Sequence, residues 1–270
     1  MSMTEQLFKT YEKELTEFED WVKDHPRLPN RFNKLLLLRF LKVYDFDIEA
    51  AKKLLILNLE TRKKYPHIFH NRDLFSDEIQ TAMSTLRCCT LPKNTKENHK
   101  ITVFHLADPD PNNFSYVDIV RMILASLDTR LIYCDPNELI DGEISIVDVS
   151  GFSFRHFTKT ISHIGTMKAY LSYAQEAAPI KIIQTHFINC PPIINKLIAI
   201  IKPFMTKEVW ESLKVHSTLE SLYEHVSPDL LPIELGGTAC SFDEIYKLTK
   251  AGIESQRDYV LCDDNWKILD

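Results

Sequence analysis

Residues 180–237 constrain the fold more than any other part of the chain. Residues 181–189 (KIIQTHFIN) predict a buried strand, because they are rich in β-branched and aromatic side chains and follow a proline. Two consecutive prolines end the strand, and proline is tolerated in the first turn of a helix. The next residues (IINKLIAIIK) therefore predict a helix over 193–202, which Pro203 ends.

Apolar residues recur at helical spacing along this predicted helix and form one broad stripe. They are Ile193, Ile194, Leu197, Ile198 and Ile201. One interpretation of such a stripe is packing into a solid core. The residues that follow the helix favour a second interpretation, because Phe204 and Met205 extend the apolar face and a second short helix is predicted over 206–214. A helix with a proline hinge suits a movable lid over an apolar cavity that also meets a membrane.

Strands and helices alternate in the middle of the chain. Residues 101–107 and 143–149 are predicted strands, and a helix with one apolar face is predicted between them, over 115–133. Weaker strand signals lie at Val215 and at 231–235. Strands that alternate with helices indicate crossover connections and a mainly parallel sheet. The predicted fold class is therefore α/β.

The N-terminal part predicts a helical module. Residues 3–23 and 31–44 have apolar side chains at helical spacing, and Asp47 is placed to cap a third helix that ends before Pro66. Residues 69–98 are polar and irregular apart from a weak helix near 76–85. The predicted division is 1–75 for the helical module, 76–98 for a linker with a short helix, 99–240 for the main domain, and 241–270 for a helix that docks over 242–250 and an acidic end that frays.

Several motifs recur at characteristic spacing. HFINCPPIINKLIAIIKPFM is followed by LPIELGG and preceded by DGEISIVDVSG, and LLLLRFLKVYDFD lies in the helical module. Together they resemble the CRAL-TRIO lipid-transfer family, which includes the tocopherol-transfer and cellular retinaldehyde-binding proteins. The matching positions are His186, Ile188, Asn189, Pro191, Ile201 to Met205, Leu231 to Gly237, Gly142, Ile146, Asp148, Gly151, Leu38, Arg39, Phe40, Leu41 and Asp45 to Asp47. The resemblance covers about residues 30–245. It implies a helical module packed on an α/β domain whose hydrophobic pocket is closed by a mobile gate, the helix over 193–202.

Charge and composition restrict the partners. A net charge of −6 provides no basic field that would attract nucleic acid or an anionic surface. No apolar run approaches the roughly 20 residues that span a bilayer, and the charged start of the chain is unlike a secretory signal. Six scattered cysteines then predict free thiols in a reducing compartment. We expect a cytoplasmic monomer that contacts membranes transiently.

The chain lacks the motifs of common catalytic and metal sites. There is no G-x-S-x-G elbow, no H-E-x-x-H pair and no phosphate-binding glycine loop, and the adjacent Cys88 and Cys89 have the wrong spacing for zinc. A calcium-loop-like start at Asp108 fails, because Ile119 stands where the bidentate glutamate belongs. Asp148 is expected to cap backbone amides at the end of its strand. We expect no enzyme activity, no metal, and no cofactor other than a bound lipid.

The predicted pocket wall combines alternate strand residues, helix residues and the gate. It comprises Val103, His105, Ile119, Ile123, Leu127, Ile146, Asp148, Phe154, Phe157, Ile161, Ile164, Ile182, Gln184, Phe187, Ile194, Leu197, Ile198 and Ile201. The predicted gate and membrane face comprises Ile193, Ile194, Leu197, Ile198, Ile201, Phe204 and Met205. The candidates for binding a lipid headgroup are Lys42, Lys181, Lys202, Lys207 and Lys214.

Two functions fit these features. The first is a carrier that binds one small lipid of the tocopherol, retinoid, fatty acid or phospholipid class and exchanges it with membranes through the gate. The second is a regulatory module in which lipid occupancy controls binding to a partner protein or a phosphoinositide, with residues 241–270 as a contact. A hydrolase is disfavoured, because no nucleophile motif is present.

Phosphoinositide binding is an expectation that comes from the resemblance alone. In tocopherol-transfer-like members, a basic cluster beside the gate binds phosphoinositide headgroups and triggers release. Lys181 matches the first basic position of that cluster. Ile183, Ser212 and Tyr44 replace its other basic positions, so this chain keeps only part of the cluster.

Overall fold

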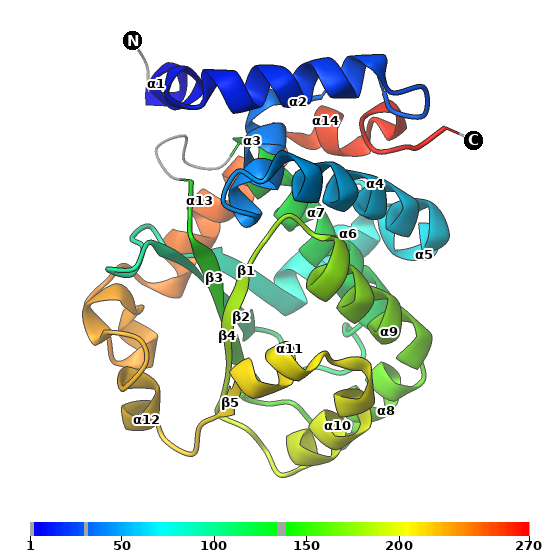
Figure 1. The fold of residues 1–270 in the computed structure, drawn as a ribbon. Coiled ribbons are helices and arrows are strands. Elements are labelled where there is room, and N and C mark those ends of the chain that lie inside the picture. Colours follow the sequence, from blue (N-terminus) through cyan, green and yellow to red (C-terminus); the bar gives the residue numbers. More distant parts are fainter. Residues whose placement is uncertain (1–2, 30–31, 134–138, 270) are drawn as a thin grey trace.

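The computed structural model of the protein describes residues 3–29, 32–133 and 139–269, and it begins with a helical module that lies above the sheet in Figure 1. Cys134 falls outside the described residues, and the other five cysteines are free thiols. The helices before the sheet are α1 (Met3–Thr10), α2 (Glu12–Asp24), α3 (Lys34–Val43), α4 (Ile48–Lys64), α5 (Pro66–Phe69) and α6 (Asp77–Thr85).

Local sequence signals set where the helices of the module begin. Asn33 caps α3, and Asp47 caps α4, each through a side-chain oxygen that accepts hydrogen bonds from backbone N–H groups of the first turn. The single helix predicted over 3–23 is instead two helices that meet at Tyr11. The Tyr11 ring stacks on Phe46, with 4.1 Å between the ring centroids, which fixes this junction against the turn between α3 and α4.

In the described chain, five strands form one sheet in the order β1-β2-β3-β4-β5. The strands β2 to β5 run parallel, and β1 pairs antiparallel with β2. The strands are β1 (Leu86–Thr90), β2 (His99–Leu106), β3 (Gly142–Asp148), β4 (Ile182–Ile188) and β5 (Leu213–Val215). Helices connect the parallel neighbours, so the predicted α/β class is confirmed.

Two short segments differ from the sequence-based expectation. β1 lies inside 69–98, which was expected to be irregular, because a strand of only five residues that includes Arg87 and Thr90 gives a weak pattern. Residues 231–235 were expected to be a strand, but Ile233–Leu235 is a 3₁₀ helix (η4). Pro232 lacks a donor for a sheet, and Gly236 turns the chain with a φ of 72°.

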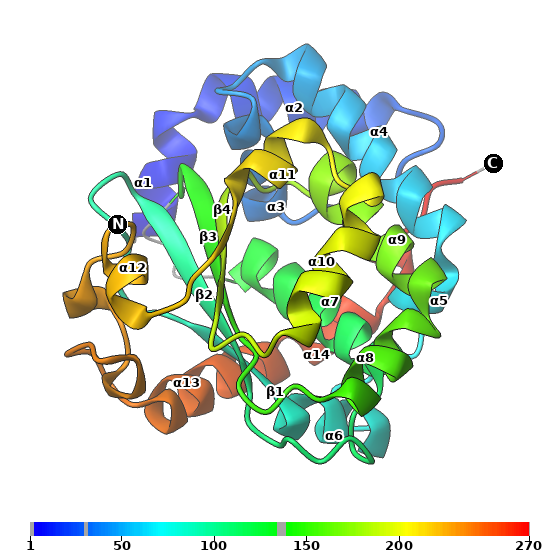
Figure 2. The ribbon, with the colours of Figure 1, turned by 90° about the horizontal axis from the view of Figure 1, so that it is seen from below.

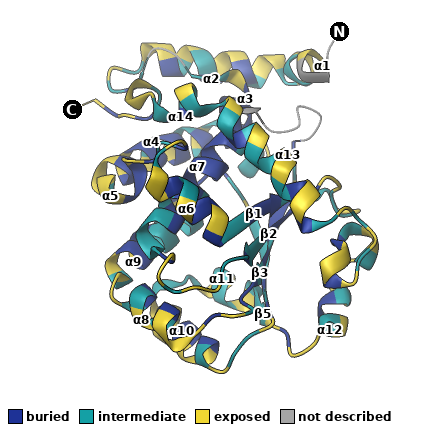
Figure 3. Cartoon of the chain, turned by 180° about the vertical axis from the view of Figure 1, so that it is seen from behind, coloured by how far each residue is buried: buried dark blue, intermediate teal, exposed yellow. Residues whose placement is uncertain are grey.

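Helices cover both faces of the sheet (Figures 1 and 2). On one side lie α7 (Tyr116–Tyr133), α8 (Phe154–Ile161), α9 (Ile164–Ser172), the π-helix η1 (Tyr173–Ala177), α10 (Ile193–Ile201), the 3₁₀ helix η2 (Lys202–Phe204) and α11 (Lys207–Ser212). On the other side lie α12 (Leu219–Tyr223), the 3₁₀ helix η3 (Pro228–Leu230) and α13 (Phe242–Ser255). Figure 3 shows that the helices expose their outer faces and that much of β2 and β3 is buried. None of the helices in the described ranges is long and apolar enough to cross a bilayer.

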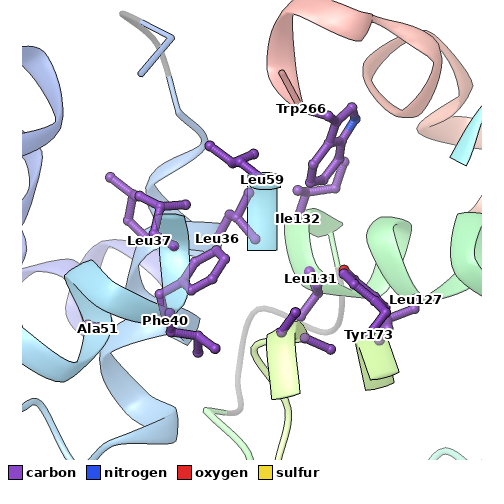
Figure 4. Close-up of a cluster of buried hydrophobic side chains, with 14 of the residues drawn as sticks. Leu36, Leu37, Phe40, Ala51, Leu59, Leu127, Leu131, Ile132, Tyr173 and Trp266 are labelled. Atoms are coloured by element: carbon purple, nitrogen blue, oxygen red, sulfur yellow. The ribbon is translucent and has the colours of Figure 1, made fainter. Parts of the chain in front are cut away.

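The helical module and the main domain share one apolar cluster, shown in Figure 4. Leu36 and Phe40 of α3 and Leu59 of α4 belong to the same buried cluster as Leu127 and Leu131 of α7. The LLLL run of α3 is buried along its whole length, which explains why it is apolar nearly all round. The module is therefore packed firmly on the sheet domain.

A buried ionic network lies at the same junction. The Asp128 carboxylate accepts hydrogen bonds from Arg62 Nη1 at 2.9 Å and from Arg72 Nη1 at 2.6 Å. Arg62 also donates to the Tyr173 hydroxyl at 2.7 Å, and its guanidinium lies 4.1 Å from the centroid of the Trp266 ring. Burial alone would raise the pKa of Asp128, but the two guanidiniums hold it below its ordinary value. The network ties α4, α7, η1 and the C-terminal segment together.

The C-terminal segment folds back on the helical module. After α13 come α14 (Arg257–Leu261) and the 3₁₀ helix η5 (Asp263–Asn265). Trp266 and Ile268 are buried, and the backbone N–H of Leu269 donates to the carbonyl of Arg27 at 2.9 Å. The expectation of a frayed end is therefore wrong up to residue 269, because two apolar side chains anchor it.

Candidate hydrophobic ligand cavity and its gate

A cavity of about 290 Å³ lies between the sheet and the helices on its α7 side. Most of its wall is apolar and comes from all five strands, α7, α9, α10 and the residues after α10. The central strand residues that reach it are alternates in register on adjacent strands. They are Thr102 and Phe104 of β2, Ser145 and Val147 of β3, and Thr185 and Phe187 of β4. The volume is at the lower end of the range for pockets that hold small organic ligands.

About half of the predicted pocket residues line this cavity. They are Ile119, Ile123, Leu127, Ile182, Phe187, Ile194, Leu197 and Ile201, together with Met205 from the predicted gate. Three of them come from one face of α7 and three from one face of α10, so helical spacing identified these positions.

The predicted strand residues lie mostly on the wrong face. Val103, His105, Ile146, Asp148 and Gln184 do not line the cavity. Val103 and Ile146 are buried in the cluster formed with α12 and α13, and the His105 ring stacks on Phe242 of α13 at 4.7 Å between centroids. Both faces of β2 and β3 are apolar and covered by helices. Alternation therefore separates the residues of the two faces, but it does not tell which face meets the cavity.

A β-bulge in β4 sets which of its residues face the cavity. Glu143 pairs with Ile182, and the next residue of β3 pairs with Gln184, so Ile183 is an extra residue without a partner. The bulge shifts the alternation by one position. Ile182, Thr185 and Phe187 consequently reach the same cavity, which a strict period of two does not predict.

Five predicted helix residues also lie outside the cavity wall. Phe154 at the start of α8 is 66% exposed, whereas Phe157, Ile161 and Ile164 are half-buried against the cluster that contains α10. Ile198 is buried in that cluster without reaching the cavity. The amphipathic α8 therefore packs beside the gate helix and presents one phenylalanine to solvent.

The predicted gate helix covers one side of the cavity. Ile194, Leu197, Ile198 and Ile201 form its buried face. Its opposite face is exposed and includes Ile200, which is 39% exposed. Ile193 is half-buried, and so are Phe204 and Met205 beyond the end of α10.

The segment after α10 is held by one side chain of η1. Gln175 Nε2 donates to the carbonyl of Phe204 at 3.0 Å, and Gln175 Oε1 accepts from the backbone N–H of Thr206 at 2.7 Å. Pro203 lies in η2 between α10 and these contacts. Gln175 also lines the cavity, so one residue borders the cavity and holds the segment after α10.

The predicted headgroup lysines fall into separate places. Lys42 and Lys181 line a second hollow of about 160 Å³, in which Lys42 Nζ pairs with Asp141 at 2.7 Å. Lys202 Nζ lies 4.0 Å from the centroid of the Trp210 ring. The remaining two are Lys207, whose ammonium lies 3.8 Å from Glu211 Oε1, and Lys214 on β5.

An ion pair separates the two hollows, and sequence reasoning missed it. Arg130 and Glu143 line both hollows, and Arg130 Nη2 donates to the two carboxylate oxygens of Glu143 at 2.9 and 2.7 Å. Arg130 Nη1 also donates to Thr102 Oγ1 at 3.1 Å. The available signal was the alternation of polar residues at the start of β2 and β3, where Lys100, Thr102, Glu143 and Ser145 share one face.

The conspicuous titratable residues outside the cavity make structural contacts. Asp148 accepts hydrogen bonds from the backbone N–H of Ser150 at 3.1 Å and from Asn189 Nδ2 at 2.9 Å. His186 and His216 are joined Nδ1 to Nε2 at 2.8 Å, and burial lowers the pKa of His186 to about 3. The part of the chain that the structure describes contains no group of three side chains placed to hold a metal ion.

Two family models match the chain. The model for the CRAL/TRIO domain matches residues 85–237, and the model for a Pinta-like UBA domain matches residues 7–79. The chain is 27% identical over 257 residues to alpha-tocopherol transfer protein-like of Homo sapiens, which covers 90% of this chain and 73% of that protein. It is 30% identical over 237 residues to clavesin-1 of Xenopus laevis, which covers 87% of this chain and 70% of that protein.

The fold is also similar to a solved structure. The crystal structure of Sfh5 superposes with a TM-score of 0.55 at 13% sequence identity, over 96% of both chains. At this identity the likeness concerns the fold alone.

Proposed function

The chain belongs to the CRAL/TRIO domain family, whose members are lipid-transfer proteins, and from this premise we propose that it is a non-enzymatic carrier of one small hydrophobic lipid. The lipid would occupy the cavity beneath α10 and exchange with membranes when that helix moves. The observation that carries the proposal is the cavity itself, which is lined mainly by apolar side chains and is covered by a helix with one apolar face. The proposed lipid is of the tocopherol, retinoid, fatty acid or phospholipid class.

Magnitudes support a role for the membrane in exchange. A ligand that buries on the order of 500 Å² of apolar surface gains roughly 12 kcal/mol relative to water, of which association and ordering return a large part. Extraction from a bilayer gains far less, because the lipid is already out of water there. Opening of the gate must therefore be stabilised at the membrane surface.

Two exposed apolar residues beside the gate suit that membrane contact. Phe154 of α8 is 66% exposed and stacks on Phe157, and Ile200 of α10 is 39% exposed. α8 and α10 pack against each other, so the two residues belong to neighbouring helices. Insertion of such side chains gains up to about 1.5–3 kcal/mol each when it is complete, compared with about 1 kcal/mol for a lysine at an anionic leaflet.

We place the carrier in the cytoplasm, as a monomer with transient peripheral membrane contact and free thiols. Lys42 and Lys181 line the same hollow and are the pair best placed to meet an anionic headgroup such as a phosphoinositide. We assign a role to each predicted part of the chain. Residues 99–240 bind the lipid, residues 1–75 support this domain, and the C-terminal part from 241 packs against both.

The regulatory alternative has less support. Residues 241–270 were its proposed contact for a partner protein, yet Trp266 and Ile268 in this segment are buried against the helical module. The end of the segment is thus used in internal packing, and within 241–269 the large apolar side chains left exposed are Leu248 and Leu269. The carrier is therefore the better proposal.

Two measurements test the carrier. Mass spectrometry of an organic extract of the purified protein is expected to find a stoichiometric co-purified lipid, and a fluorescent analogue of that lipid is expected to move between vesicles faster with the protein than without it. A protein free of lipid that transfers none of the four analogues, tocopherol, retinoid, fatty acid and phospholipid, would contradict the proposal.

A further inference from the structure

Two tyrosine hydroxyls in the cavity have no hydrogen-bond partner among the residues that the structure describes. Tyr116 begins α7, Tyr170 lies on α9, and both rings line the cavity. Neither hydroxyl forms a hydrogen bond with another described residue. The side-chain hydroxyls of Ser145 and Thr185, on the strand side of the cavity, also form no hydrogen bond with another described residue. Because buried hydroxyls normally find a partner, this set is available to a ligand.

The Arg130–Glu143 ion pair lies within electrostatic reach of Tyr170. Burial raises the pKa of Tyr170 to about 12, and the neighbouring Cys88 and Glu143 add to this shift. Burial also raises the pKa of Tyr116, and Tyr170 adds to that shift. The helices that carry the two residues, α7 and α9, are in contact, and both residues line the cavity. Both phenols keep their protons at neutral pH, and each can donate one hydrogen bond and accept others.

We propose that Tyr170 and Tyr116 recognise the polar end of the cargo, and that the cargo is a lipid with one uncharged hydroxyl group. The inference rests on the proposed carrier function and adds the chemical class of the ligand. A hydroxyl of the cargo accepts a hydrogen bond from one phenol and donates to the other or to Glu143, while its hydrocarbon part lies against the apolar wall.

The charges around the site favour a neutral head over a carboxylate. Glu143 holds Arg130 through two hydrogen bonds, and Thr102 holds it through a third, so the guanidinium is already engaged. A fatty-acid carboxylate would bring a second negative charge beside Glu143 in a site of low dielectric. A pure hydrocarbon would leave the phenols without partners, and sites that are built to bond a hydroxyl reject ligands that lack it.

The test compares ligands that differ only at the head. Hexadecanol, hexadecyl methyl ether, hexadecanoic acid and hexadecane compete with the apolar fluorophore diphenylhexatriene for the lipid-stripped full-length protein. We expect hexadecanol to displace the fluorophore at a concentration about tenfold below that of the other three, which corresponds to one good hydrogen bond. In Tyr170→Phe and in Tyr116→Phe, the preference for the alcohol over the ether shrinks severalfold, and the affinity for hexadecane is unchanged.

Two controls separate recognition from structure. Tyr44→Phe, at an exposed tyrosine outside the cavity, is expected to leave the preference intact. Tyr170→Phe should not lower the melting temperature of the stripped protein, because its hydroxyl has no protein partner to lose. A lower melting temperature with an unchanged preference would overturn the inference.

The two proposals fail in distinguishable ways. If the fluorophore binds and the alcohol and ether compete equally, the carrier function stands and the hydroxyl-recognition inference is wrong. If the acid competes best, the cargo is a carboxylate and the inference is also wrong. If neither the fluorophore nor any lipid binds, the carrier function itself is wrong.

Discussion

Gln175 and Thr206 are joined by a hydrogen bond of 2.7 Å that holds the end of the gate to the π-helix η1. The side-chain amide of Gln175 also donates to the carbonyl of Phe204 at 3.0 Å. One side chain therefore bonds a backbone carbonyl and a backbone N–H on either side of Met205. A backbone segment held on both sides cannot leave the cavity without breaking both bonds. In the proposed carrier, Gln175 is therefore the candidate latch for movement of α10 about Pro203.

Replacement of the latch should speed lipid exchange. Gln175→Leu removes two hydrogen bonds worth about 0.5–1.5 kcal/mol each, which favours the open state by about tenfold. We expect a severalfold faster transfer between vesicles and a severalfold lower retention of lipid on dilution. Gln175→Glu can accept from Thr206 but cannot donate to Phe204, and it should give an intermediate rate. Identical rates for all three proteins would show that another contact limits opening.

The two faces of the gate helix predict opposite phenotypes. Ile200→Asp places a charge on the exposed face. In the proposed carrier this face meets the membrane, so the variant should slow transfer severalfold with little change in melting temperature. Ile198→Ala removes a buried side chain and should cost about 2–5 kcal/mol of stability. Transfer assays with anionic vesicles and thermal unfolding distinguish the pair. A large loss of stability in Ile200→Asp would place that residue in the core.

The strands β2 to β4 and the helix α10 could be predicted because their signals are local. A strand, two prolines and an amphipathic helix follow each other between Lys181 and Pro203, and each boundary is marked by a residue with a restricted backbone. The helix residues on the cavity wall also follow from spacing, as Ile194, Leu197 and Ile201 illustrate. These features depend on neighbours in sequence alone.

Most strand residues of the cavity could not be predicted, because the direction of their side chains depends on distant packing. Val103 and Phe104 are both apolar, and only the presence of α12 and α13 on one side decides which of them meets the cavity. In β4 the bulge at Ile183 changes the alternation without any glycine or proline to mark it. The polar set around Tyr170 and Arg130 joins α9, α7 and β3, whose contact no local pattern reveals.

The buried network at the module junction predicts a large and pH-dependent stability effect. Asp128→Asn leaves two buried guanidiniums without their carboxylate and should cost about 3–5 kcal/mol at neutral pH. Because the folded pKa of Asp128 is depressed, its contribution is present above the unfolded pKa of about 3.9 and is lost as the pH falls through the folded value. Urea unfolding at pH 7 and pH 3 measures the difference, which should shrink at pH 3.

An exposed ion pair is the matched control for this effect. Asp243 pairs with Arg87 at the surface, and its side chain is 68% exposed. Asp243→Asn should change the unfolding free energy by less than about 1 kcal/mol at either pH. If the two aspartate variants were equally destabilised, the buried network would not be the cause.

The pair formed by His186 of β4 and His216 predicts a loss of stability in mildly acidic solution. His186 is fully buried, and burial followed by the neighbouring His216, His225 and Lys214 lowers its pKa to about 3. The unfolded chain binds a proton near pH 6.5, whereas the folded chain does not until about pH 3. The contribution of His186 to the free energy of unfolding is therefore fully present above about pH 6.5. It falls as the pH drops from there, by up to about 1.4 kcal/mol per pH unit for this one proton.

Urea unfolding at pH 7.5 and pH 5.5 measures this effect. The free energy of unfolding should decrease between the two pH values, and the decrease should be smaller in His186→Gln but unchanged in His225→Gln, at the neighbouring exposed histidine. An equal drop in the wild type and in His186→Gln would mean that other groups titrate in this range and that His186 is protonated in the folded protein.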